Sequence, residues 1–230
     1  MKTIGMIGGM SWESTADYYR ILNRETQRRL GGIHSAKALL WSFDFGEIEA
    51  LQSAGDWEGA AGRLVGAGRA LVQAGAEFLM ICCNTMHVMA DAVEQGAGVP
   101  LLHIATPLGA AIAEQGLTQV GVLGTTYTLQ SDFLSAPLAR DYGIELITPT
   151  GEDARETHRI IYEELTRGRF LASSRAFFAE AIGRLAKRGA EGIVLGCTEL
   201  PLLVKPDDSP APLFDTGALH ALAAVDMALA

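Results

Sequence analysis

The stretch GAEFLMICCNT at residues 75–85 decides the fold, because much of it recurs as GAEGIVLGCTE at residues 189–199. In each copy a Gly-Ala-Glu leads into a short apolar run, and a cysteine follows the glycine by eight residues. A second pair, IGMIGG at residues 4–9 and VGVLGT at residues 120–125, recurs at an offset of 116 residues, against 114 for the cysteines. Two pairs of similar segments with nearly the same offset predict that the chain has two similar halves, as a duplication would produce.

Short apolar runs bounded by glycine alternate with longer amphipathic segments along the whole chain. The pattern predicts strands at residues 3–7, 38–41, 78–81, 101–104, 119–123, 145–148, 192–195 and 213–214, and helices at residues 14–29, 57–74, 153–167 and 174–188. This alternation is typical of an α/β fold with parallel sheets flanked by helices. We expect two similar Rossmann-like lobes related by pseudo-two-fold symmetry, with the active site in the cleft between them. Residues 1–104 and 208–230 form the first expected lobe, and residues 105–207 form the second.

Composition and charge limit the partners. The 230 residues are 49% hydrophobic, which is enough for a buried core, and 18 basic against 27 acidic residues give a net charge of −9. A nucleic-acid binder needs a basic face, so this balance argues against one. The N-terminus enters an apolar run without signal-peptide features, no segment approaches 18 consecutive apolar residues, and three cysteines suit a reducing compartment. We therefore expect a cytoplasmic protein with no nucleic-acid or membrane partner.

Cys83 and Cys197 carry the chemistry that this arrangement predicts. Each falls at the carboxyl end of an expected parallel strand, where ligands of α/β sheets bind and where we expect the next helix to begin. A helix N-terminus stabilises a thiolate. Two thiols on opposite sides of one carbon can remove a proton from one face and return a proton to the other, which is a stereoinversion. Cys82 points to the opposite face of its strand, so we assign it to packing.

Other kinds of site fit the sequence less well. Neither C-x-x-C nor H-x₃-H spacing occurs, so we expect no metal. The glycine-rich segment at residues 5–11 matches neither a dinucleotide fingerprint nor a P-loop, although its backbone could cradle a carboxylate. His87, four residues after Cys83, suits the partner of a cysteine nucleophile, and equally a capping or supporting histidine. Threonines at the strand ends suit a small polar substrate or simple helix caps.

Three motifs resemble those of the aspartate/glutamate racemase family. They are GGMSWEST at residues 8–15, CNTMH at residues 83–87 and GCTEL at residues 196–200, and the likeness extends over essentially the whole chain. It is greatest with the bacterial branch that has broad amino-acid or L-aspartate/glutamate racemase activity. The resemblance implies a two-lobed α/β fold, catalysis without pyridoxal phosphate, metal or any other cofactor, and frequently a homodimer.

The resemblance also implies roles for individual residues. Cys83 and Cys197 would be the two acid/base groups acting on an amino-acid substrate. Archaeal-type aspartate racemases have an arginine and a lysine where this chain reads SFDFGEIE at residues 42–49 and EELTR at residues 163–167, so Gln52 and Arg167 are the candidate substitutes. The implied substrate-binding set is Met10, Ser11, Gln52, Asn84, Thr85, Met86, Thr126, Arg167 and Thr198.

The leading prediction is a cofactor-independent racemase of aspartate, glutamate or both, working by proton transfer between two thiols. Sibling reactions are open as alternatives, namely hydantoin racemisation, maleate isomerisation and arylmalonate decarboxylation. Decarboxylases of that type need one cysteine, so the retained pair speaks against them. A non-catalytic module that binds a small carboxylate is the alternative outside enzymology, since fold alone does not establish function.

Overall fold

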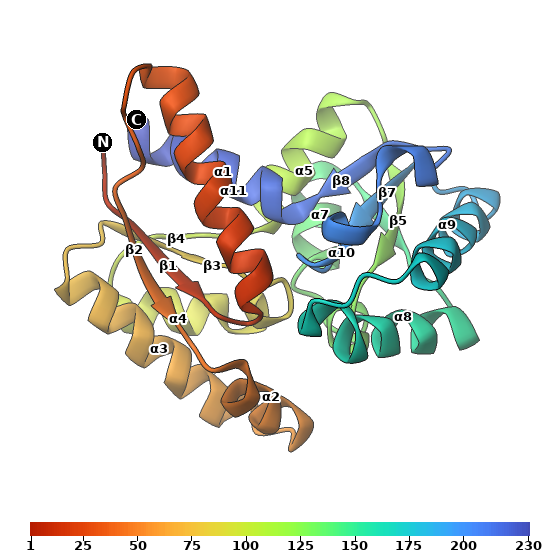
Figure 1. Ribbon diagram of the computed structural model, residues 1–230, viewed down its shortest axis with the longest axis horizontal. Helices are drawn as coiled ribbons and strands as arrows, with labels where there is room; N and C mark the ends of the chain where they lie inside the picture. Colours follow the sequence, from red (N-terminus) through yellow and green to blue (C-terminus); the bar gives the residue numbers. More distant parts are fainter. The chain divides into compact units, whose positions relative to one another are not determined.

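The computed structural model describes residues 1–230, and the chain divides into two compact units (Figure 1). Unit 1 consists of Met1–His103 and His220–Ala230, and unit 2 of Ile104–Leu219. Each unit contains a four-stranded parallel sheet, in the order β2-β1-β3-β4 in unit 1 and β6-β5-β7-β8 in unit 2. The strand orders are the same once the second set is renumbered. The predicted α/β class with two similar halves is therefore confirmed, and all eight expected strands are present.

Unit 1 has helices on both faces of its sheet. Its strands are β1 (Ile4–Gly8), β2 (Ala38–Ser42), β3 (Phe78–Ile81) and β4 (Leu101–Leu102), and its helices are α1 (Trp12–Leu30), α2 (Phe45–Ser53), α3 (Trp57–Gln73), the 3₁₀ helix η1 (Thr85–Met89), α4 (Ala90–Ala97) and most of α11 (Thr216–Leu229). Side chains alternate along the strands, so Met6 and Met80 pack with α1 and α11, whereas Ile7 and Ile81 pack with α2, α3 and α4.

Unit 2 repeats this layering with different helices. Its strands are β5 (Gln119–Leu123), β6 (Glu145–Ile147), β7 (Gly192–Leu195) and β8 (Leu213–Asp215), and its helices are α5 (Ala105–Glu114), α6 (Thr126–Gln130), α7 (Ser135–Tyr142), α8 (Gly151–Glu163), η2 (Leu165–Arg167), α9 (Ala172–Lys187), α10 (Leu200–Leu203) and η3 (Pro206–Asp208). One face of the sheet packs against α5 and α7, and the other against α8, α9 and α10. None of the helices in either unit combines the length and the apolar character needed to cross a bilayer.

The repeated Gly-Ala-Glu has the same structural role in both units. Its glycine has a φ of +105° in the first copy and +101° in the second, a backbone conformation that glycine adopts without a steric penalty. Glu77 Oε2 accepts a hydrogen bond from the backbone N of Thr3 at 2.7 Å. Glu191 Oε2 accepts from the backbone N of Thr118 at 3.0 Å and of Gln119 at 3.1 Å. The motif therefore turns the chain into the inner strand and anchors the start of its neighbour.

The division of the chain differs from the expected one after residue 207. We assigned residues 208–230 to the first lobe, but β8 pairs in parallel with β7, with Leu213 opposite Ile193. This pairing places residues 208–219 in unit 2, and the chain returns to unit 1 within α11, at His220. The helix expected at 153–167 is also shorter, because α8 ends at Glu163 and the 3₁₀ helix η2 follows.

Candidate active site

Cys83 and Cys197 occupy equivalent positions in the two units. Cys83 lies two residues beyond β3 and Cys197 two residues beyond β7. In each unit the residue before the cysteine extends the sheet by one hydrogen bond, donated to Ile7 O at 2.8 Å in unit 1 and to Leu123 O at 2.7 Å in unit 2. The same ladder therefore fixes the backbone just before each thiol.

Cys82 and Cys83 pack on opposite faces of the sheet of unit 1. Cys82 is fully buried in the core formed with α1 and α11, and burial raises the pKa of its thiol far above the ordinary value. Cys83 is only partly buried and packs against the other core cluster, formed with α2, α3 and α4. This is the arrangement expected if Cys82 has a packing role, since a neutral buried thiol behaves as a small apolar side chain.

The expectation that an ordinary helix begins directly after each cysteine is wrong. The segment after Cys83 is the 3₁₀ helix η1, and α10 after Cys197 has only four residues. Lys205, which precedes Pro206, has extended backbone angles, because a proline disfavours the helical conformation in the residue before it. The 3₁₀ geometry of η1 and the single turn of α10 align fewer peptide dipoles next to the cysteines than the expected helices would, so the expected thiolate stabilisation is weaker.

Close packing and hydrogen bonds fix the loop after β1, which contains the candidate residues Met10 and Ser11. Gly9 has a φ of +84°, and a Cβ at this position would lie 2.4 Å from both N and O of Phe43. Thr15 Oγ1 accepts from Gly9 N at 3.0 Å and donates to Ser11 O at 2.7 Å. Both Met10 and Ser11 are buried, and the peptide bond between them is cis. Only glycine fits at position 9.

Four of the predicted site residues of unit 1 lie in one region. Met10 and Met86 belong to the buried cluster against which Cys83 packs. Gln52 on α2 is also buried, and its Nε2 donates to Met86 Sδ at 3.1 Å. The structure therefore brings Gln52 to the segment that carries Cys83, although 31 residues separate them in the sequence.

Asn84 and Thr85 are both buried in the same segment. The carbonyl of Asn84 accepts from His87 N at 3.0 Å. His87 Nδ1 lies 2.8 Å from Cys83 O, and because a carbonyl only accepts, this nitrogen carries the hydrogen. Burial, together with His220 and His103, holds the pKa of His87 well below its usual value. His87 is thus a neutral imidazole that holds the backbone carbonyl of Cys83.

His87 belongs to a group of three histidines that the sequence analysis did not assemble. Its ring centroid lies 4.8 Å from that of His103 and 5.5 Å from that of His220. His220 Nε2 donates to Leu102 O at 2.8 Å, which leaves Nδ1 to accept from Tyr18 Oη at 3.1 Å. Burial lowers the pKa of His220 to about 4. No local spacing reveals this group, because His87 and His220 are 133 residues apart.

Cys197 has a carboxylate as its partner. Cys197 Sγ donates to Glu199 Oε2 at 2.9 Å, and Thr198 Oγ1 donates to the same oxygen at 3.2 Å. The exposed fraction is 9% for Cys197 and 2% for Glu199, so the contact is shielded from solvent. Glu199 is absent from the predicted site residues. The sequence signal was the acidic residue two positions after the cysteine, which entered the sequence analysis only as part of the motif GCTEL.

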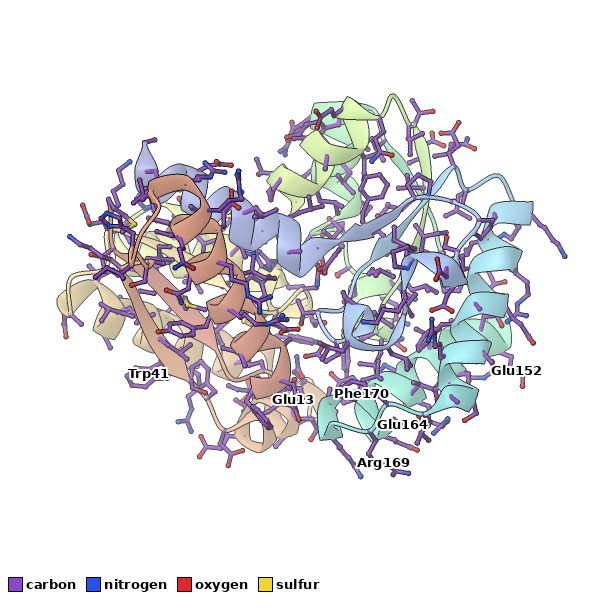
Figure 2. The ribbon with its side chains drawn as sticks, turned by 45° about the horizontal axis from the view of Figure 1, so that its top comes forward. Glu13, Trp41, Glu152, Glu164, Arg169 and Phe170 are labelled. Atoms are coloured by element: carbon purple, nitrogen blue, oxygen red, sulfur yellow. The ribbon has the colours of Figure 1, made fainter.

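The last two predicted residues lie elsewhere in unit 2. Thr126 follows β5, the strand beside β7, and its backbone N donates to His158 Nδ1 at 3.2 Å. Arg167 is exposed in η2. The turn around it is organised by the buried Glu164, which accepts from Ser174 Oγ and Arg159 and whose carbonyl accepts from Arg169 N. Figure 2 labels Glu164 and Arg169 in this region. The described residues contain no group of three or more His, Cys, Asp or Glu side chains that could hold a metal ion.

These observations define a class of protein: two repeated α/β units, each with a cysteine at the same point beyond its inner strand. The sequence model of the family described as Asp/Glu/Hydantoin racemase matches residues 7–224. The chain therefore belongs to the Asp/Glu/hydantoin racemase family, and the resemblance seen in its motifs is confirmed.

Solved structures and curated relatives agree with this membership. A Yersinia pestis protein provisionally described as an Asp/Glu racemase is 49% identical over the full length of both chains, with a TM-score of 0.91. An aspartate racemase homologue from Pyrococcus horikoshii is 32% identical, again over both full chains, with a TM-score of 0.85. The broad specificity amino-acid racemase RacX of Bacillus subtilis is 26% identical over 70% of this chain and 68% of its own length. The match spans only 66% and 56% of the length of two further curated relatives, the second a glutamate racemase from Pseudomonas paraeruginosa.

Proposed function

We propose that this protein is a cofactor-independent amino-acid racemase in which Cys83 and Cys197 are the two proton-transfer groups. The observation that supports this most directly is the repetition of one cysteine at one position of two similar units. Binding alone does not require matched thiols, whereas inversion at a carbon requires two groups that exchange roles. Relatives described as an aspartate racemase homologue, a glutamate racemase and a broad specificity amino-acid racemase support aspartate, glutamate or both as substrates.

In the proposed reaction one cysteine acts as a thiolate and the other as a thiol. The thiolate takes the hydrogen from Cα as a proton, and the electron pair of that bond stays on the carbon. The thiol then gives its proton to the opposite face of the carbon and becomes a thiolate. The two sulfurs have exchanged protonation states, so the same pair can serve the reverse direction. A thiolate is a modest base, so hydrogen bonds to the developing negative charge must supply much of the stabilisation.

The α-carboxylate of the substrate is assigned to Asn84, Thr85, Thr126 and Thr198 together with the Met10–Ser11 backbone. The hydroxyl of Thr198 has one hydrogen, which it donates to Glu199. Thr198 can therefore donate to the substrate carboxylate only when its hydrogen bond to Glu199 is broken. Gln52 and Arg167 are assigned to the substrate side chain, and a guanidinium suits a carboxylate better than an amide does.

Isotope exchange at Cα tests the proposal. The purified protein is incubated in D₂O, without added cofactor, with separate L- and D-forms of aspartate, glutamate and several neutral amino acids. Proton NMR follows the loss of the α-hydrogen signal, and chiral chromatography follows the opposite enantiomer. We expect exchange with inversion from both enantiomers of at least one amino acid. Protein carrying both Cys83→Ala and Cys197→Ala is the control for contaminating racemases. Absence of exchange with every amino acid would contradict the proposal and favour hydantoins or maleate as the next substrates to assay.

A further inference from the structure

We infer that Glu199 holds Cys197 as a thiol in the resting protein, so that Cys197 begins the reaction as the proton donor and Cys83 as the base. The assignment of donor and base rests on the proposed function. The protonation state of Cys197 does not, because it follows from contacts within unit 2.

The geometry joins the thiol and the carboxylate directly. The distance from Cys197 Sγ to Glu199 Oε2 is 2.9 Å, and the thiol is the only one of the two groups that can donate to an ionised carboxylate. Thr198 Oγ1 donates to the same oxygen at 3.2 Å, so two donors converge on one carboxylate oxygen.

Charge then decides where the proton rests. Loss of the proton from Cys197 to solvent would place a thiolate beside an ionised carboxylate, and two negative charges in a shielded site repel each other strongly. Cys197 lies in an apolar cluster with Ile161, Leu165 and Leu200, which offers no bulk solvent to screen that repulsion. Tyr162 on α8 packs against the cluster, and its ring contacts His158, whose pKa burial lowers. A neutral His158 supplies no compensating positive charge.

The two cysteines therefore differ in their surroundings. The carboxylate of Glu199 contacts the thiol of Cys197, whereas the neutral imidazole of His87 contacts the backbone carbonyl of Cys83. A negative partner charge disfavours the thiolate of Cys197. The thiolate that starts the reaction is then the one on Cys83.

The proton balance of a full cycle follows from this resting state. The Cys83 thiolate takes the α-hydrogen as a proton, and Cys197 gives its proton to the opposite face of the carbon. A proton from solvent then reaches the Cys197 thiolate through Glu199, whose carboxylate is protonated and passes the proton to sulfur. Cys83 releases its proton to solvent. Charge and protons balance, and no other reactant is needed.

Alkylation of the three cysteines measures these states without any substrate. Wild-type protein is treated briefly with iodoacetamide at a series of pH values, and fragment-ion mass spectrometry quantifies each cysteine separately. The pH at which alkylation is half-maximal reports the thiolate and does not depend on accessibility. We expect this pH to be at least one unit higher for Cys197 than for Cys83. The reverse order, or equal values, would overturn the inference.

The Glu199→Gln variant isolates the carboxylate. Without the negative charge, we expect Cys197 to be alkylated about tenfold faster at pH 7, which corresponds to one pH unit in the half-maximal value. Glu199→Asp retains the charge and should stay close to wild type. Unchanged or slower alkylation of Cys197 in the Gln variant would overturn the inference.

Internal controls separate this effect from local unfolding. Cys82 is fully buried, so its alkylation in any variant reports opening of the fold, and the wild-type comparison then decides the inference by itself. Glu114→Gln is the matched control, since it makes the same chemical change at an exposed residue of unit 2 and should leave Cys197 unchanged. The expected alkylation order without isotope exchange would support the thiol state of Cys197 and contradict the proposed racemase activity.

Discussion

The segments that follow β3 and β7 have the same backbone and different chemistry. Each continues the sheet by one hydrogen bond and then presents a cysteine. Beyond the cysteine they diverge, since an imidazole holds the carbonyl of Cys83 and a carboxylate holds the thiol of Cys197. The repeated part of the sequence therefore places the sulfur atoms. The residues next to them are not repeated, and they determine the protonation of each thiol.

The largest expected effect comes from removing either sulfur. We expect Cys83→Ala and Cys197→Ala each to lower racemisation at least about 1,000-fold, or about 4 kcal/mol in the activation free energy, because inversion needs both proton-transfer groups. The single variants should nevertheless differ. The sulfur that remains in each can still exchange the α-hydrogen of one enantiomer with solvent, more slowly in Cys83→Ala because Glu199 disfavours the thiolate of Cys197, and the favoured enantiomer should be opposite in the two variants. NMR in D₂O measures this exchange.

Cys82→Ala is the matched control, because it makes the same change one residue away on the other face of the sheet. It should keep racemisation within a fewfold of wild type while lowering stability slightly. Near-normal racemisation by either Cys83→Ala or Cys197→Ala would contradict the two-thiol reaction.

The strands were predictable because a short apolar run and nearby glycines indicated the same segments. The apolar runs at residues 78–81, 119–123 and 192–195 coincide with β3, β5 and β7, where glycines bound a run long enough for a buried strand. The place of β8 was not predictable, because pairing with β7 depends on contacts that no local pattern contains. The same limit applies to the histidine group, which joins α11 to the segment after β3.

The chemical part of the site was predictable to different degrees. The equivalent positions of Cys83 and Cys197 followed from the repeat, since a fixed distance beyond a strand is a backbone property. The partner of each thiol depends on how a neighbouring side chain turns, and the sequence does not specify this. Glu199 was therefore missed although it lies only two residues from Cys197.

The loop after β1 tests the comparison at the level of the backbone. Gly9 corresponds to Thr125 in the repeat, but its φ of +84° and the 2.4 Å approach to Phe43 forbid a side chain. We expect Gly9→Ala to lower the free energy of unfolding by about 3 kcal/mol, since strained backbone and overpacking add. Gly124→Ala, in the equivalent loop of unit 2, should cost about 1 kcal/mol or less. Its Cβ would lie 3.2 Å from the nearest atoms, and its φ is not positive.

Urea unfolding distinguishes the two glycine variants. Trp12, Trp41 and Trp57 all belong to unit 1, so tryptophan fluorescence reports the unfolding of that unit. Circular dichroism follows both units together. Equal losses of stability in the two variants would mean that the loops after β1 and β5 tolerate a side chain equally well. That result would contradict the prediction, which rests on the different backbones of the two loops.

Acid should also distinguish the two units. Four of the five histidines lie in unit 1, and His220 there is fully buried with a pKa lowered to about 4. The unfolded chain takes up a proton at this residue near pH 6.5 and the folded chain does so only near pH 4. The stabilising contribution is therefore complete above about pH 6.5, and it is lost as the pH falls towards 4. The shift corresponds to about 3 kcal/mol, and His87, whose pKa is lowered in the same direction, adds to it.

His220→Gln reduces this dependence while an amide remains able to donate to Leu102 O. The groups that face His220 are Tyr18 on α1, His87 on η1 and His103 after β4, and Asp91 and Glu94 raise the pKa of His103 against the effect of its burial. We expect the variant to be less stable than wild type at pH 7 but to lose about 2 kcal/mol less between pH 6.5 and 4.5, as measured by tryptophan fluorescence in urea. His34→Gln, at an exposed position, is the control for the substitution itself. If His220→Gln left the pH dependence of unit 1 unchanged, the neutral histidine group would not be what makes this unit sensitive to acid, and the contrast between the units would reduce to the partners of their two cysteines.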